Sequence, residues 1–157
     1  MSLFDTHTRE QLRRSYADAW SKHAARAPLT ELEAAIVGVI DAHREYQALV
    51  SDRDAAVSFE PGATLGAENP FLHMGLHLAV RDQLSVDRPP GVCELHRLLQ
   101  VRCGGPHGAE HALMEALGET LWQAQRDGQI PDESRYLGLA RRILDTTGGS
   151  PQRHSKG

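Results

Sequence analysis

The chain has 157 residues and a formal net charge of −4, with 40% hydrophobic and 24% charged residues, as expected for one soluble globular domain. The weak negative charge argues against nucleic acid as a partner, because phosphate binding needs a clustered basic face. No run approaches the roughly 18 apolar residues of a membrane span, and the N-terminus MSLFDTHTRE lacks an apolar signal core, so we expect a cytoplasmic protein.

Helical periodicity and capping signals predict a series of helices, and strand signals are nearly absent. Capping-box patterns begin at Thr8 and Thr30, and Asn69 followed by Pro70 is typical of a helix start. Residues 51–68 have no clear period and are expected to form a connection. The patterns place helices over about residues 8–25, 30–50, 69–84, 92–102, 106–126 and 131–144.

These elements predict an all-α fold, a helical bundle of four to six helices with a buried histidine cluster. We expect a single domain over residues 1–145. The polar sequence TTGGSPQRHSKG predicts a disordered tail over residues 146–157. Apolar residues on the back of the third predicted helix, Phe71, Met74 and Leu78, would suit a homodimer.

Histidine is the residue type that stands out, with nine in the chain. His73 and His77 are four residues apart, as are His107 and His111, so each pair can converge on one ion from one face of a helix. His43 lies on the apolar stripe of another predicted helix. Bundles build metal sites from such inward-facing side chains. Burying five histidines without a common purpose costs about 1–3 kcal/mol for each unsatisfied polar group.

Glu110 lies on the same inner stripe as His107 and His111. It can ligate or bridge ions, or act as the catalytic base toward a bound water. A first-turn glutamate can also simply offset the helix dipole. The roles of four further residues stay open at this point: His23, His96, Cys93 and Cys103.

The types of ligand narrow the metal to a divalent transition ion. Imidazole with carboxylate suits iron and zinc first, and also nickel or manganese. Five histidines and one glutamate exceed what one tetrahedral ion needs, which favours two ions, such as a dinuclear non-haem iron site.

Two segments resemble a known family, the uncharacterised bacterial domain of unknown function 1841. They are NPFLHMGLHLAVRDQLSVDRPPGV and HGAEHALMEALGETLWQAQRDGQIPDESRYL. The resemblance implies a helical fold and a cytoplasmic bacterial origin. More loosely, His43 with His73 and His77 is similar to the three-histidine site of DinB-like bundles. The five-histidine set with its carboxylate is similar to hemerythrin-like di-iron bundles, although the full hemerythrin ligand pattern is missing.

Three hypotheses follow for the function. The first is a metal-binding bundle whose ligands are His43, His73, His77, His107, His111 and Glu110, acting on dioxygen, water or another small molecule. The second is a mononuclear zinc or nickel site on the first three histidines, with a thiol-transfer or hydrolytic role. The third is a non-enzymatic interaction module in which the histidines form a pH-sensitive network. The sequence names no substrate and leaves open whether the protein is an enzyme.

Overall fold

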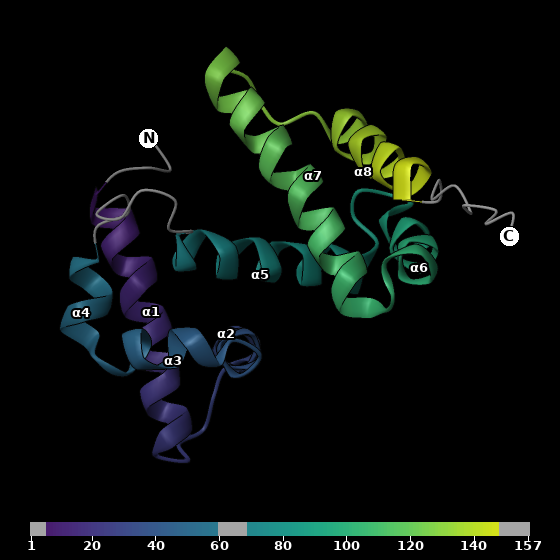
Figure 1. Cartoon of the computed structure of the whole chain (residues 1–157). Helices are drawn as coiled ribbons and strands as arrows, with labels where there is room; N and C mark the ends of the chain where they lie inside the picture. Colours follow the sequence, from purple (N-terminus) through teal and green to yellow (C-terminus); the bar gives the residue numbers. More distant parts are fainter. Residues whose placement is uncertain (1–5, 60–68, 148–157) are drawn as a thin grey trace, which may run out of the picture. The chain divides into compact units, whose positions relative to one another are not determined.

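The computed structural model describes residues 6–59 and 69–147, and the regular secondary structure in these ranges is α-helix without a strand (Figure 1). This confirms the all-α prediction. The described ranges hold eight helices: α1 (Thr6–Ala24), α2 (Glu31–Asp41), α3 (Arg44–Ser51), α4 (Arg53–Ser58), α5 (Pro70–Val86), α6 (Val92–Cys103), α7 (Pro106–Asp127) and α8 (Glu133–Thr147). No helix in these ranges is both long and apolar enough to cross a membrane.

The chain divides into two compact units, Met1–Leu78 and Ala79–Gly157. The boundary between them falls inside α5. The division into compact units does not decide how many domains the chain has, so the single domain over residues 1–145 stays a prediction. α8 runs to Thr147, so the first two residues of the predicted tail are helical. Its remaining residues, 148–157, lie outside the described ranges.

The first unit is built on α1, which contacts α2, α3 and α4. Tyr16 of α1 meets Phe71 of α5 edge-on, with ring centroids 5.7 Å apart. Arg13, one turn before Tyr16, donates hydrogen bonds to the carbonyl oxygens of Val57 and Phe59 at 3.3 and 2.7 Å. These carbonyls lie at the C-terminal end of α4, where the last carbonyl groups of a helix have no amide donor within that helix. A buried arginine therefore ties α1 to the end of α4.

Burial raises the pKa of the Tyr16 phenol to about 12. In the unfolded chain a tyrosine ionises near pH 10, so the folded state holds this proton over a range in which the unfolded state has lost it. The contribution of Tyr16 to the free energy of unfolding should therefore fall by about 2–3 kcal/mol as the pH rises from about 10 to 12. Because burial also raises the pKa of the Tyr136 phenol, urea unfolding across this range would measure the loss from both tyrosines, and Tyr16→Phe should remove the part that belongs to Tyr16. An equal alkaline loss in Tyr16→Phe would contradict the assignment to this phenol.

The predicted helix over residues 30–50 begins as expected but is interrupted at His43. At its start, the Glu33 amide donates to Thr30 Oγ1 at 3.2 Å and the Thr30 amide donates to Glu33 Oε1 at 3.1 Å. α2 then ends at Asp41, and α3 starts at Arg44. The expectation of one continuous helix is therefore wrong, although the capping box that starts it is confirmed.

A short helix, α4, lies within the segment that was expected to be a connection. Asp52 caps it by accepting a hydrogen bond from the Ala55 amide at 3.1 Å. Together, α4 and the division between α2 and α3 raise the number of helices above four to six. The later part of that predicted connection, residues 60–68, lies outside the described ranges.

The second unit consists of α6, α7 and α8, which contact one another, with the C-terminal half of α5. α7 carries most of the core and buries Ala109, Leu113 and Leu117 along one face. The Tyr136 hydroxyl of α8 donates to Gln83 Oε1 of α5 at 2.6 Å. In the first turn of α7, a Cβ on Gly108 would lie only 2.3 Å from the carbonyl oxygen of Cys103 at the end of α6, so this tight approach requires glycine.

Candidate metal centre

His73 and His77 lie one helical turn apart on α5, and their rings face each other. The predicted start of this helix is confirmed, because Asn69 Oδ1 accepts hydrogen bonds from the amides of Phe71 and Leu72 at 3.1 and 3.4 Å. The Nε2 atoms of His73 and His77 are 3.2 Å apart. Two imidazole nitrogens bound to one tetrahedral zinc ion, at about 2.0–2.1 Å each, are separated by about 3.3 Å. The pair is therefore already at ligand spacing.

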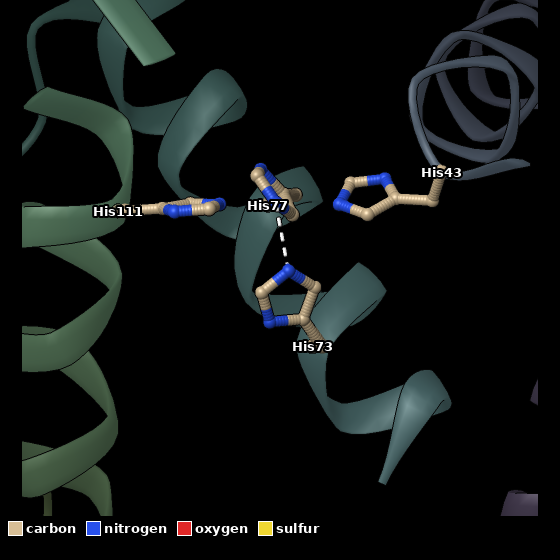
Figure 2. A group of neighbouring side chains, drawn as sticks. All are labelled: His43, His73, His77 and His111. Carbon is tan, nitrogen blue, oxygen red and sulfur yellow. Dashed lines mark hydrogen bonds between the residues drawn. The ribbon is translucent and has the colours of Figure 1, made fainter. Parts of the chain in front are cut away.

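His43 reaches the pair on α5 from the break between α2 and α3 (Figure 2). Its backbone is not helical, with φ −125° and ψ 77°. The amide of His43 donates to the Ile40 carbonyl at 3.0 Å, while its ring Nδ1 lies 2.7 Å from the Val39 carbonyl oxygen. The imidazole thus bonds the carbonyl that the amide would serve in a continuous helix. Because a carbonyl only accepts, Nδ1 carries the proton and Nε2 has the lone pair that a metal ion needs.

The three rings form a compact group inside the first unit. The centroids of His43 lie 5.1 Å from His73 and 4.6 Å from His77, and those of His73 and His77 lie 4.8 Å apart. Each residue offers one ring nitrogen, and these atoms are all within 4.8 Å of one another. His77 is fully buried and His43 is 5% exposed, whereas His73 is half-buried. A buried group of three imidazoles with this spacing can hold a metal ion.

Tyr46, a residue of α3, lies next to the group of three histidines. Its ring stacks on His43, with centroids 5.4 Å apart and planes within 10°, and meets His73 edge-on at 6.2 Å. Val39, Ile40 and Met74 are fully buried in the hydrophobic core of the same unit. The Tyr46 ring therefore covers one side of the His43 imidazole.

The other predicted ligands belong to the second unit, on α7. The rings of His107 and His111 are neighbours, with centroids 4.2 Å apart, as the spacing of four residues predicts. His107 is exposed, however, in contrast to the expected inward position. Glu110 is buried as expected, and its Oε1 accepts a hydrogen bond from Arg81 Nε at 2.8 Å.

The ion pair gives Glu110 a role that needs no metal. Glu110→Gln should lower the free energy of unfolding by about 1–2 kcal/mol, because it leaves the Arg81 guanidinium without a charged partner. The protein's metal content should stay unchanged if this is the residue's main role. Chemical unfolding and elemental analysis of the same preparation would measure both. Loss of metal in Glu110→Gln would instead support the prediction that this carboxylate ligates or bridges.

The residues left open by the sequence take positions outside the three-histidine group. His23 packs beside Trp20 at the end of α1, with ring centroids 5.3 Å apart. His96 Nδ1 lies 3.0 Å from the side-chain amide nitrogen of Gln100. The Nε2 atom of His96 is buried without a partner within the described part of the chain. The Cys93 thiol donates to the Leu84 carbonyl at 3.1 Å, and burial raises the pKa of this thiol. Both cysteines are unpaired thiols.

Comparison with known proteins places the chain in a family. The sequence profile of the domain of unknown function (DUF1841) matches residues 8–142. The chain belongs to this family. The match covers both segments that carried the resemblance in the sequence, and all three histidines of the group lie within it. Nothing among the curated proteins or the solved structures matches the chain significantly.

Proposed function

We propose that this DUF1841 protein binds one divalent transition-metal ion through His43, His73 and His77. The observation that carries the proposal is the convergence of three imidazoles within the first unit, with two of the ligand nitrogens 3.2 Å apart. The Nδ1 hydrogen bond of His43 to a main-chain carbonyl adds support, because metal-bound histidines are usually oriented through their second ring nitrogen.

The donor set favours zinc, with nickel and iron as the next candidates. Three neutral imidazoles are a known catalytic zinc set, and they leave a coordination position for water or a substrate. An ion held in this way lowers the pKa of a bound water to about 7, which supplies a nucleophile at neutral pH. A hydrolytic or thiol-transfer role is therefore the activity that we propose to test first.

A dinuclear iron site is the second candidate. Its support is the close pair of His107 and His111 rings on one turn of α7, which offers two further ligands. The engagement of Glu110 by Arg81 weighs against a bridging carboxylate. The exposure of His107 weighs against a dry second site.

Elemental analysis of untagged protein tests both candidates. We expect about one ion per chain, lost in a His73→Ala/His77→Ala double variant. The matched control is His107→Ala/His111→Ala, which removes the same number of imidazoles at the same spacing. Two iron ions per chain, reduced in both double variants, would favour the dinuclear site. Weaker affinity without a change in stoichiometry in the control variant would identify the α7 pair as a source of one more ligand. Protein that takes up no zinc, nickel, iron or manganese would overturn the proposal.

A further inference from the structure

We propose that the second unit contains a binding pocket for a small zwitterion, an aliphatic amino acid that carries one ammonium and one carboxylate group. The pocket is a cavity of about 290 Å³ that opens to solvent. Its lining comes from the C-terminal half of α5, the turn between α5 and α6, α7, and the start of α8. None of the histidines proposed to bind the metal lines this cavity, so the inference is independent of the metal centre.

The volume of the cavity limits the ligand to about the size of one amino acid. A water molecule takes about 30 Å³ in the liquid, so the cavity has room for about ten non-hydrogen atoms. This places it at the lower end of the range of small-molecule pockets. Leucine and its isomer ε-aminocaproate are both of this size.

The buried part of the lining is apolar and held in place. Leu117 and Pro89 are buried, and so is Tyr136. The Tyr136 hydroxyl donates to Gln83 Oε1 at 2.6 Å, which joins α8 to α5 across the cavity lining. Burial raises the pKa of this phenol, so it keeps the proton that makes the bond. The cavity is therefore formed before a ligand arrives, and its buried part suits an aliphatic chain.

The exposed part of the lining carries charges of both signs. Arg88 lies in the turn after α5, and Asp132 and Glu133 lie at the start of α8. Arg88 forms no ion pair with either acid or with another residue of the described ranges. The carboxylate next to it in the sequence, that of Asp87, accepts a hydrogen bond from the Cys93 amide at 3.0 Å instead. The guanidinium is therefore available to a ligand.

The two acids also keep acceptors that a ligand could use. Asp132 Oδ1 caps α8 and accepts hydrogen bonds from the amides of Ser134 and Arg135 at 2.9 and 3.4 Å. In the described part of the chain, Asp132 Oδ2 and the Glu133 carboxylate have no hydrogen-bond donor. Opposite charges that line one cavity without neutralising each other match a ligand that carries both. Arg88 would bind its carboxylate in a bidentate manner, and the acids would bind its ammonium group.

An NMR titration of isotope-labelled full-length protein provides the test. The probes are leucine and ε-aminocaproate, with hexanoate and hexylamine as ligands that keep the chain but only one charge. At least one zwitterion should bind with a dissociation constant at least about threefold below those of both single-charge probes, and should shift the amide signals of Thr120 and Tyr136 in the lining. Hexanoate or hexylamine binding as tightly as the better zwitterion would overturn the inference. So would unchanged Thr120 and Tyr136 signals up to the solubility limit of leucine.

Two variants separate the charges of the lining. Arg88→Gln should weaken binding of the zwitterion at least about threefold and leave hexylamine unaffected. Glu133→Gln should weaken it at least about twofold, because Asp132 remains, and leave hexanoate unaffected. Arg141→Gln and Glu31→Gln are the matched controls, since they make the same charge changes at exposed residues outside the cavity. Equal losses in the variants and their controls, or unchanged binding in both variants, would show that these charges do not select the ligand.

Discussion

Replacing His77 with alanine is expected to produce the largest loss of metal affinity of any single substitution in the chain. Its Nε2 lies 3.2 Å from that of His73, and its ring is the only fully buried one among the three imidazoles. Histidine- and cysteine-bound zinc sites with four ligands release about 10–16 kcal/mol on binding, or about 3 kcal/mol for each ligand. The dissociation constant should therefore rise by about 100-fold or more. Competition with a chromophoric chelator would measure it.

His77→Ala should also lower the free energy of unfolding of the metal-free protein by about 2 kcal/mol, because the missing ring leaves a cavity in the core. His23→Ala is the matched control, since His23 is exposed near the end of α1 and contacts Trp20 outside the group. The control should change neither metal affinity nor stability by a measurable amount. Equal affinities of wild type and His77→Ala would be incompatible with the proposed site.

Adding metal to the metal-free protein is expected to raise its stability strongly and in a pH-dependent way. An ion that binds only the folded state adds about 2.7 kcal/mol to the free energy of unfolding when its concentration is 100 times the dissociation constant. One ligand comes from the break between α2 and α3 and two come from α5, so the ion would tie these two parts of the first unit together. Thermal unfolding with and without zinc, followed by removal with a chelator, would measure the gain.

The sign of the pH effect follows from the ligands. Imidazole must give up its extra proton to bind a metal ion, so acid competes with the metal, and the metal-dependent gain should shrink as the pH falls from about 7.5 to 5.5. With three histidines, the affinity can fall by up to about three orders of magnitude per pH unit at the acidic end. A gain that stays constant across this range would point to carboxylate ligands. The His73→Ala/His77→Ala variant should show no gain at any pH.

Local signals in the sequence were sufficient to predict most of the helices. The caps at Thr30 and Asn69 are confirmed, as are the starts of α6 and α7 at Val92 and Pro106. The spacing of His73 and His77 also predicted their convergence correctly. These features depend on residues within a few positions of one another. They can therefore be derived without knowledge of how distant segments meet.

The features that the sequence did not predict depend on contacts between distant or unexpected partners. A periodic pattern assumes a continuous helix, so it could not anticipate that the His43 ring would take the Val39 carbonyl and divide the segment. Arg81, the partner of Glu110, lies 29 positions away in the sequence, so helical periodicity could not predict this pair either. His107 was expected on an inner stripe, yet it sits in the first turn of α7, where that stripe reaches the end of the helix and the side chain is exposed.

The hydrogen bond between His43 and Val39 makes the course of the main chain depend on one side chain. An alanine at position 43 would leave the Val39 carbonyl oxygen free to accept from the amide of residue 43, as in a regular helix. It would therefore favour one continuous helix from Glu31 to Ser51. Loss of the imidazole would thus redirect everything that follows it in α3, including the Tyr46 ring. The same side chain would therefore both set the bend and hold the ion, so a substitution of His43 would change the two together.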